Sequence, residues 1–501
     1  MKKFYSFYNV YSIQKRFVAT ILIIIVLFFA LIFRVFYLQI INGRHLQVLA
    51  AEEWLRDLPL SSKRGDIYDC NGVSLATTIT TYDVYVRARN VVEPSELAGK
   101  INKLLGVDYD KAYTKITNTS LSEILIKMQV EEQIAKELAK FKGIYLSQNV
   151  ARKYPYSNLF TQVLGYCTID NIGQAGLESY YNKYLKGING KSLTQTNAQG
   201  KEIENSLGYY IPSVAGADLN TTLDVQMQSI LESELMSAYN EHKALGVSGI
   251  IMETETGGIK AMSCLPSFDL NNVPRNDLSA LQAMSKNACV VDVYEPGSTF
   301  KLITLAAALN EGLTNENERF YCGGRTTVDG EKIKCWKSTG HGSINLVEAF
   351  EKSCNCVFVN LALRVGLDKY YEYLNLFGIG EKTGVDIASE SSGIVMPKEQ
   401  VRTVDLARIG FGHAVAVTQL QMASVYSKIT TGNEITPHVM ENISSEGEIL
   451  YKTTKTTNKI NLKEETVRTV NKLLANNLNT TGELTFIAGY DVGGKTGVLP
   501  I

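Results

Sequence analysis

Residues 296–301 read Pro-Gly-Ser-Thr-Phe-Lys and run into residues 302–310, whose apolar pattern predicts a helix. Ser298 and Lys301 are three residues apart, so they share one face of this helix. Free backbone N–H groups at a helix N-terminus can hold a developing oxyanion, and a lysine with a lowered pKa can take the proton of a serine. The pattern predicts a nucleophilic serine, although a serine that only caps the helix beside an exposed lysine has the same spacing.

A second motif, Ser353-Cys354-Asn355, ends a helical stretch over residues 346–352. Its serine hydroxyl can relay a proton, and its asparagine amide can bridge a lysine and a substrate carbonyl. Serine and asparagine are common at helix ends, so this triplet indicates a catalytic site only when its position relative to the other motifs is considered.

A third motif reads Gly-Gly-Lys-Thr-Gly-Val over residues 493–498 and predicts a strand edge that a ligand can approach closely. The Lys495 ammonium and the Thr496 hydroxyl can bind a carboxylate there. Residues 489–496 also have the spacing of a phosphate-binding loop, but such a loop needs a long helix after it, and only five residues follow Thr496. We therefore interpret the motif as a carboxylate site.

The order and spacing of the three motifs indicate a family. Ser353 lies 55 positions after Ser298, and Lys495 lies 142 positions after Ser353, as in the penicillin-recognising serine enzymes. The chain resembles a class B penicillin-binding protein of the division and sporulation type. The resemblance covers nearly the whole chain, through segments 64–72, 152–155, 173–178, 266–269 and 294–297. Two positions depart from the family pattern: Cys70 replaces an arginine, and residues 412–414 read Gly-His-Ala.

The resemblance implies a peptidoglycan D,D-transpeptidase that needs no cofactor. Ser298 would attack the D-Ala-D-Ala end of a stem peptide, and Lys301 would take the serine proton. Ser353 would pass a proton to the leaving amine, and Asn355 would orient Lys301 and the substrate amide. Penicillin and other β-lactams would acylate the same serine.

The resemblance also implies a substrate-binding set, formed by Lys495, Thr496, Gly497 and Val498. Lys495 and Thr496 would hold the terminal carboxylate of the stem peptide, while the backbone N–H groups of Ser298 and Val498 would hold the oxyanion. The amine of a second stem peptide would then attack the acyl-enzyme and form the cross-link. A glycosyltransferase of the SEDS class would be the expected partner in the membrane.

Residues 17–41 form a largely apolar stretch of 25 residues, in which Arg34, near its end, is the one charged residue. As a helix, this stretch is long enough to cross the ~30 Å hydrocarbon core of a bilayer. Residues 1–16 carry four basic and no acidic residues, whereas residues 42–60 carry two basic and three acidic ones. The positive-inside rule therefore predicts a single-pass protein with a cytoplasmic N-terminus and an extracytoplasmic catalytic domain. A cleaved signal peptide is the alternative, but residues 42–45 offer no small-x-small cleavage site.

We expect an α+β chain with a tail over 1–16, the transmembrane helix over 17–41, an elongated non-catalytic pedestal or dimerisation module over 42–214, and a transpeptidase domain over 215–501. In that domain residues 225–238 predict a helix capped by Asp224, and residues 246–252 and 259–262 predict two antiparallel strands. The resemblance implies an antiparallel sheet flanked by helices, with further strands after Gly497. Residues 498–501 do not supply these strands, so we expect a C-terminus that is incomplete, and an activity that depends on the missing strands.

Composition excludes several classes of function. The chain carries 50 basic and 51 acidic residues, which gives no support to a nucleic-acid-binding surface. Its five histidines are scattered without the spacing of metal ligands, so we expect no metal centre.

Two other functions are alternatives to the transpeptidase. A serine β-lactamase is disfavoured because such enzymes are single secreted domains without segment 64–72. A non-catalytic cell-wall scaffold would act through residues 1–214.

The segment from Tyr321 to Trp336 predicts a β-hairpin around a turn at Asp329-Gly330. A two-residue loop pairs residues 328 and 331 and puts Cys335 opposite residue 324. A four-residue loop instead puts Cys322 directly opposite Cys335, close enough for a disulfide after a small adjustment. The sequence leaves both registers open, and with them the alternatives of a disulfide and two free thiols.

Overall fold

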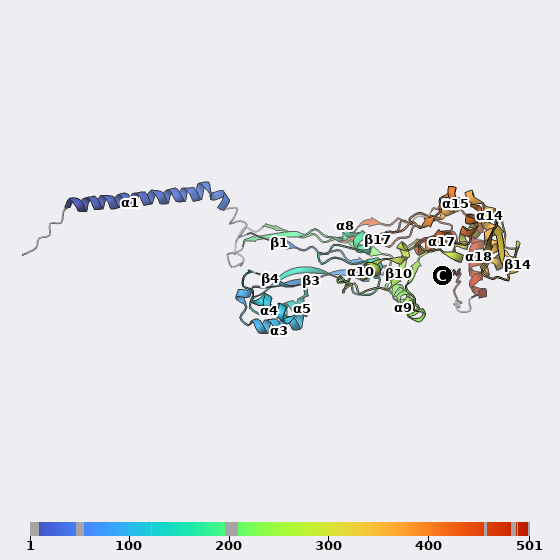
Figure 1. Ribbon diagram of the computed structural model, residues 1–501, viewed down its shortest axis with the longest axis horizontal. Helices are drawn as coiled ribbons and strands as arrows, with labels where there is room; N and C mark the ends of the chain where they lie inside the picture. Colours follow the sequence, from blue (N-terminus) through green and yellow to red (C-terminus); the bar gives the residue numbers. More distant parts are fainter. Residues whose placement is uncertain are drawn as a thin grey trace, which may run out of the picture. The chain divides into compact units, whose positions relative to one another are not determined.

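The computed structural model describes residues 10–46, 55–121, 123–195, 209–454, 458–481, 487 and 489–498 (Figure 1). The chain divides into two units. One comprises residues 1–61 and 189–214, and the other comprises residues 62–188 and 215–501.

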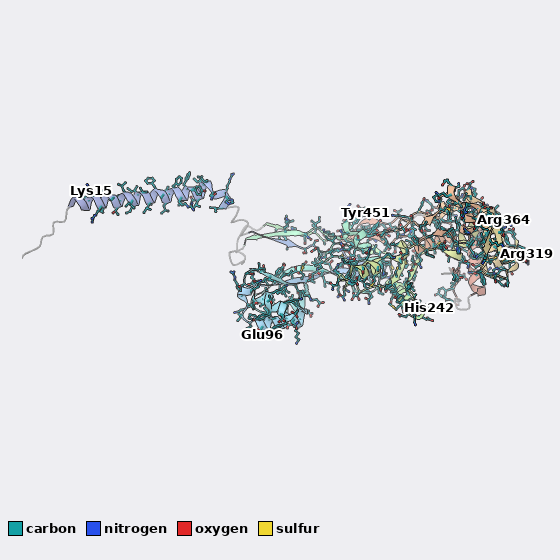
Figure 2. All side chains as sticks on the ribbon, viewed as in Figure 1. Lys15, Glu96, His242, Arg319, Arg364 and Tyr451 are labelled. Carbon is teal, nitrogen blue, oxygen red and sulfur yellow. The ribbon has the colours of Figure 1, made fainter. Side chains whose placement is uncertain are left out.

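The first unit begins with the apolar helix that the sequence predicts. Helix α1 (Val10–Phe36) continues as a π-helical turn (Tyr37–Ile41), and residues 14–41 are long and apolar enough to cross a membrane. Figure 2 shows the side chains of α1, with Lys15 labelled, projecting from the helix on all sides. The same unit holds an antiparallel sheet in the order β1-β6-β7, formed by β1 (Leu55–Leu60), β6 (Gly190–Gln195) and β7 (Tyr209–Ile211).

A mixed sheet of seven strands joins distant parts of the second unit. Its order is β18-β17-β8-β2-β3-β4, and β5 also pairs with β3. The short strand β2 lies parallel to β8, so segment 64–72 is held beside residues that follow the predicted pedestal. The strands are β2 (Ile67–Tyr68), β3 (Ser74–Val86), β4 (Ile124–Glu131), β5 (Ile144–Lys153), β8 (Asp218–Thr221), β17 (Met440–Ser445) and β18 (Glu448–Lys452).

Three helices close a small core with β3 and β4. They are α3 (Pro94–Leu105), α4 (Tyr109–Thr117) and α5 (Glu132–Leu138). Helices α4 and α5 contact the strands, and α3 packs on these two helices. In α3 the buried positions Leu97, Ile101 and Leu105 recur every four residues, which is the spacing of one helical face. Gly106 then ends α3 in the left-handed conformation that glycine adopts at little cost.

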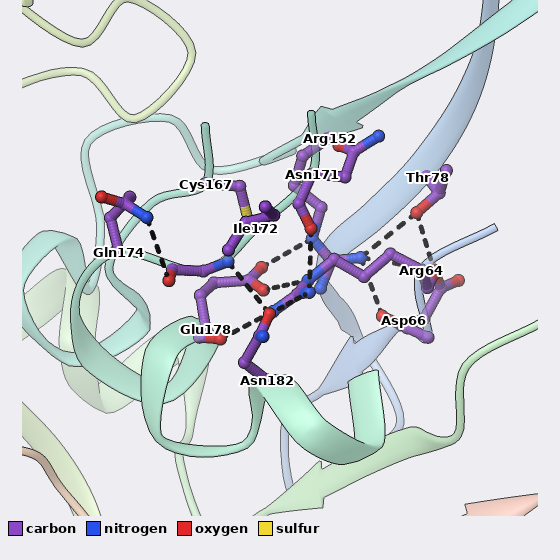
Figure 3. A network of polar contacts seen from close by, with 12 residues as sticks. Arg64, Asp66, Thr78, Arg152, Cys167, Asn171, Ile172, Gln174, Glu178 and Asn182 are labelled. Carbon is purple, nitrogen blue, oxygen red and sulfur yellow. Dashed lines mark hydrogen bonds and ion pairs between the residues drawn. The ribbon is translucent and has the colours of Figure 1, made fainter. Parts of the chain in front are cut away.

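A buried ion network fastens segment 64–72 to the segment around residue 178 (Figure 3). Glu178 accepts a 2.5 Å hydrogen bond from Nε of Arg64 and a 2.6 Å bond from Nε of Arg152, and all three side chains are at most 4% exposed. Asn182 Oδ1 accepts a 2.8 Å bond from Arg64. Burial alone would raise the pKa of Glu178, but the charges of Arg152 and Arg64 outweigh that effect and lower it.

We expect Glu178→Ala to destabilise the protein by about 3–5 kcal/mol, because it leaves the buried Arg64 without its counter-charge and Arg152 with only Asp66, 4.0 Å away. Urea unfolding followed by circular dichroism measures the change in the free energy of unfolding. Glu372→Ala, which removes an exposed glutamate paired with Lys369, is the matched control and should leave that free energy nearly unchanged. Equal effects of the two substitutions would show that the network is not what holds these segments together.

The helix and strands that the sequence predicts after residue 215 are confirmed. Helix α9 (Val225–His242) begins at Asp224, whose carboxylate accepts hydrogen bonds from the N–H groups of Gln226 and Met227. Strands β9 (Val247–Met252) and β10 (Ile259–Leu265) pair antiparallel. Helices α9, α11 (Ala288–Val291) and α17 (Gln419–Thr431) contact this pair.

Helix α12 (Lys301–Asn310) is the centre of the largest core. Nine of its ten residues are buried, because it is contacted by α14 (Asn355–Val365), α15 (Leu367–Phe377), α17 and α18 (Glu464–Thr481). Figure 1 shows α14, α15, α17 and α18 gathered in one region of the chain. A helix buried on all sides gives the residues at its first turn a fixed position.

The other elements of this unit are short. The helices are α6 (Thr161–Leu164), α7 (Gly176–Tyr180), α8 (Asn182–Leu185), α10 (Leu278–Ser285), α13 (Leu346–Glu351) and α16 (Thr403–Ile409). The strands are β11 (Arg319–Cys322), β12 (Arg325–Val328), β13 (Glu331–Lys334), β14 (Gly342–Asn345), β15 (Ile394–Val395) and β16 (Val415–Ala416). The 3₁₀ turns are Ala88–Asn90, Gly297–Phe300 and Lys398–Gln400.

The hairpin takes the two-residue register, so the four-residue register that would place Cys322 opposite Cys335 is wrong. Val328 pairs with Glu331, and the Cys335 N–H donates to the carbonyl of Gly324. Asp329 and Gly330 both have positive φ, which makes the tight turn that suits the twist of two antiparallel strands. Cys322 pairs with Gly342 of β14 instead, and both cysteines are free thiols.

The strand predicted around residues 492–494 is also wrong. Residues 489–498 contain no strand, and their backbone is held by α18 instead. The Gly494 N–H donates to the carbonyl of Leu474 at 3.1 Å, and Asn477 Nδ2 donates to the carbonyl of Gly494 at 2.6 Å. These bonds satisfy backbone groups that a sheet would otherwise pair.

Candidate active site

Ser298 lies in the 3₁₀ turn Gly297–Phe300, directly before α12. Gly412 holds this turn in place, because its carbonyl accepts a 3.0 Å hydrogen bond from the Gly297 N–H. A Cβ atom on Gly412 would lie 2.0 Å from the Gly297 carbonyl oxygen, so only glycine permits this contact. The fixed turn and the buried helix behind it set the position of the Ser298 hydroxyl.

Lys301, one turn further on, is fully buried and directs its ammonium group at Ser298. Nζ lies 3.1 Å from Ser298 Oγ, 2.8 Å from the Ser353 carbonyl, 3.0 Å from Ser353 Oγ and 2.7 Å from Asn355 Oδ1. All four partners are neutral oxygens. The structure thus brings the four residues that the sequence predicts as catalytic into one cluster.

The pKa of Lys301 is lowered to about 7, mainly by burial and then by the charge of Lys495. An ordinary lysine has a pKa near ~10.4 and is almost entirely protonated at neutral pH. With a pKa of about 7 a large fraction of Lys301 is neutral. Its lone pair can then accept the Ser298 proton over the 3.1 Å that separates the two groups.

Ser353 contacts both Ser298 and Lys301. Its hydroxyl donates to Ser298 Oγ at 2.7 Å and accepts from Lys301 Nζ. Ser353 has a φ of +50°, a conformation that costs a non-glycine residue free energy unless its surroundings enforce it. The turn between α13 and α14 therefore holds this hydroxyl at a position that a relaxed chain would not favour.

Asn355 opens α14 and has partners on both sides of its amide. Oδ1 accepts from Lys301, and Nδ2 donates to the carbonyl of Lys334 at 3.3 Å. These bonds fix which end of the amide faces the lysine.

The segment with Lys495, Thr496, Gly497 and Val498 lies across the same site. The pKa of Lys495 is lowered to about 8 by burial, and its Nζ donates to the Thr496 carbonyl at 3.0 Å. A Cβ atom on Gly497 would come within 3.0 Å of the Pro296 carbonyl oxygen, so this glycine packs directly on the turn that carries Ser298. Val498 is 83% exposed.

A cavity of about 950 Å³ opens in front of these groups. Ser298, Ser353, Asn355, Lys495, Thr496 and Val498 all line it. Its size is that of a site for a peptide-like ligand rather than for an ion.

Several residues of this cavity were not identified from the sequence. They include Lys332, Lys334, Trp336, Lys352, Arg408 and His413. The basic ones, together with Lys495, favour an anionic ligand. Arg408 and Trp336 belong to no motif, so only their place in the fold reveals them. His413 stands in segment 412–414, which departs from the family pattern. His413 lies 3.4 Å from Glu295, and burial lowers its pKa.

Two domain families of known proteins match this chain. The model of the penicillin binding protein transpeptidase domain matches residues 247–498, and that of the penicillin-binding protein dimerisation domain matches residues 59–221. The chain belongs to the class B penicillin-binding proteins. Stage V sporulation protein D of Bacillus subtilis is 35% identical over 97% of this chain and 76% of its own length. The probable peptidoglycan D,D-transpeptidase PenA of Neisseria meningitidis is 28% identical over 95% of this chain and 80% of its own.

Solved structures share the fold. Penicillin Binding Protein 2X from Streptococcus thermophilus aligns with a TM-score of 0.69 at 22% identity, over 84% of this chain and 66% of that one. A peptidoglycan synthetase from Bifidobacterium adolescentis aligns with a TM-score of 0.68 at 21% identity, over 89% and 87% of the two chains. The predicted order of an apolar helix, a dimerisation domain and a transpeptidase domain is thereby confirmed.

We predict that the rate of acylation by penicillin rises with pH through about 7 and then levels off. The reason is that only neutral Lys301 accepts the serine proton, and the neutral fraction grows as pH passes the lysine pKa. Stopped-flow acylation measured from pH 5 to 9 gives the midpoint. Lys301→Ala should be slower by about 10²–10⁴-fold above this midpoint, the usual contribution of a general base, and the difference should narrow at lower pH because wild-type Lys301 is protonated there. A wild-type rate that does not change with pH would contradict the assignment of this base.

Proposed function

We propose that this penicillin-binding protein is a peptidoglycan D,D-transpeptidase in which Ser298 forms the acyl-enzyme. The observation that carries the proposal is the hydrogen-bonded triangle of Ser298, Lys301 and Ser353, with distances of 2.7–3.1 Å between their polar atoms. A buried lysine that contacts two serine hydroxyls has no evident structural purpose, because burying its charge costs free energy.

The first half-reaction follows from these contacts. Neutral Lys301 takes the Ser298 proton as Oγ attacks the carbonyl carbon of the penultimate D-Ala. The peptide C–N bond then breaks, and Ser353 passes a proton to the departing D-Ala amine and regains one from Lys301. An ester joins Ser298 to the shortened stem peptide, and Lys301 is neutral again.

The second half-reaction runs the same proton path in reverse. The amine of a second stem peptide enters the cavity and loses a proton to the Ser353–Lys301 pair as it attacks the ester. The C–O bond breaks, Ser298 takes back its proton, and a new peptide bond is left between the two stems. Asn355 keeps the lysine oriented through both halves by its 2.7 Å bond to Nζ.

Lys495 and Thr496 would hold the terminal carboxylate of the stem peptide, or of a β-lactam. The proximity of Gly497 to the turn that carries Ser298 supports an oxyanion site between the N–H groups of Ser298 and Val498. The further basic residues of the cavity add to its preference for an anion.

We also propose a cytoplasmic tail over 1–16, a transmembrane helix over 17–41, a pedestal over 42–214 and an extracytoplasmic catalytic domain from residue 215. The charge difference across the apolar helix supports this orientation. A SEDS-class glycosyltransferase, which makes the glycan strands, is the partner that such a cross-linking enzyme needs in the membrane. The relationship to the sporulation protein of B. subtilis supports a role in division or sporulation.

Labelled penicillin should attach covalently to Ser298 and remain attached after denaturation. Peptide mapping by mass spectrometry identifies the site, and Ser298→Ala should remove the label because no other nucleophile occupies this position. Ser279→Ala, at an exposed serine of α10, is the control and should label like the wild type. Label on another residue, or undiminished labelling of Ser298→Ala, would refute the proposed nucleophile. A folded protein that never labels would favour a non-catalytic scaffold, and rapid release of hydrolysed penicillin would favour a β-lactamase.

Replacing Lys495 by methionine should move the pH midpoint of acylation upwards. The charge of Lys495 lowers the pKa of Lys301, so its removal raises that pKa and leaves less neutral lysine at pH 7. Lys332→Met is the matched control, because Lys332 also lines the cavity but is exposed and is not among the causes of the Lys301 shift. An unchanged midpoint in Lys495→Met would show that the two ammonium groups do not interact.

A further inference from the structure

Four potential metal ligands lie close together beside the active site. Only one of them, Cys354, belongs to the three sequence motifs. The sulfur atoms of Cys322, Cys335 and Cys354 and a ring nitrogen of His341 all lie within 4.8 Å of one another. The three cysteines are at most 4% exposed, and none forms a disulfide. The ligands come from four separate places: the end of β11, the residue after β13, the residue before β14 and the turn between α13 and α14.

Three thiolates and one imidazole are a usual ligand set for a structural zinc ion. Zinc–sulfur bonds of about 2.3 Å in a tetrahedron place the ligand atoms about 3.8 Å apart. Cys335 Sγ already lies 3.7 Å from His341 Nδ1, and a small contraction brings the remaining pairs to this spacing.

The His341 imidazole has few hydrogen-bond partners among the described residues. Nδ1 faces the Cys335 sulfur, and Nε2 is buried without a hydrogen-bond partner in the described part of the chain. Buried polar groups normally find such partners, so this ring has the character of a ligand rather than of a packed side chain.

A second pair of buried cysteines, outside this cluster, serves as a comparison. Cys264 and Cys289 lie with their sulfur atoms 3.6 Å apart, but among the described residues no imidazole completes a ligand set there. Close packing of cysteines therefore occurs in this protein without a metal-binding geometry. The pair supplies matched controls, because its thiols are equally buried.

We propose that Cys322, Cys335, His341 and Cys354 bind one zinc ion, and that this ion holds the second catalytic motif in place. Cys354 is the residue between Ser353 and Asn355, the two groups that contact Lys301. Binding releases the protons of three thiols, so the affinity for zinc increases with pH. The proposal departs from the sequence-based expectation of no metal centre, which rested on ligand spacings along the chain.

The ion would join four segments at one point. It ties strand β11, the hairpin β12–β13 and the residue before β14 to the turn before α14. Two hydrogen bonds already run between the same segments: Asn355 Nδ2 to the Lys334 carbonyl, and Trp336 Nε1 to the Lys352 carbonyl at 2.9 Å. The four ligands are thus positioning residues, because they act on the reaction through the left-handed conformation of Ser353.

The test begins with the wild-type protein, purified under reducing conditions, with its zinc content measured by plasma mass spectrometry after dialysis. We expect one zinc per chain, or one rebound per chain when zinc chloride is added to chelator-treated protein. Cobalt in place of zinc should give the thiolate charge-transfer band and the visible bands of a tetrahedral site. Protein that binds no metal, or that holds a Cys322–Cys335 disulfide in its place, overturns the proposal.

Substitutions then identify the ligands. Cys335→Ser, Cys354→Ser and His341→Ala should each lose the zinc, whereas Cys264→Ser and Cys289→Ser should keep one per chain. Cys356 is the rival fourth ligand, because its thiol contacts those of Cys322, Cys335 and Cys354. Zinc that is lost from Cys356→Ser would assign Cys356 to the site and contradict the proposed set. Loss of zinc from the control variants, or zinc retained without His341, contradicts the ligand set.

A measurement without substitutions tests the positioning role even if a variant fails to fold. Removing zinc from the wild type should expose three more thiols to an alkylating reagent and lower the melting temperature, and returning zinc should reverse both changes. The acylation rate should fall on removal of zinc and recover with it, while the pH midpoint set by Lys301 shifts because its contacts with Ser353 and Asn355 loosen. An unchanged rate and midpoint in zinc-free protein would limit the ion to stability and reject the positioning role. Because zinc content and thiol exposure are read without penicillin, they stand whether or not the transpeptidase proposal does.

Discussion

The burial of the Lys301 ammonium group is the constraint on which the catalytic region depends. Its four hydrogen-bond partners are neutral oxygens, so no counter-charge offsets the cost of taking it out of water. The protein therefore keeps a lysine whose pKa is lowered to about 7. That state persists only because α12 is enclosed by other helices and the turn before it is fixed by the contact between Gly297 and Gly412.

Support for this lysine comes from parts of the chain that are far apart in sequence. Ser353 and Asn355 reach it from the turn between α13 and α14, and that turn is itself held by residues near the hairpin β12–β13. Ser353 has an unfavourable backbone conformation there. A proposed zinc ion on Cys354 would supply the free energy that holds such a turn, since the ion binds only when its four ligands are assembled.

The motifs could be predicted from the sequence because their chemistry lies in neighbouring residues. Ser298 and Lys301 are one helical turn apart, and Asp224 caps α9 through the two N–H groups beside it. The register of the hairpin depends on the length of its loop, and the sequence allows two lengths. In the structure Asp329 and Gly330 take positive φ and form the two-residue turn. The position of residues 489–498 depended on α18, and the cluster with His341 on four separate segments. Such sites have no local pattern, so only the folded chain reveals them.

The two lowered pKa values also bear on how the site treats its substrate. Lys495 repels Lys301, which keeps the base neutral while the cavity is empty. In the proposed complex the carboxylate of the stem peptide compensates the charge of Lys495, and that repulsion weakens. The pKa of Lys301 then rises, so its neutral form is a stronger base, but a smaller fraction of the lysine is neutral at pH 7. The substrate carboxylate therefore moves the pH midpoint of acylation in the same direction as removal of the Lys495 charge.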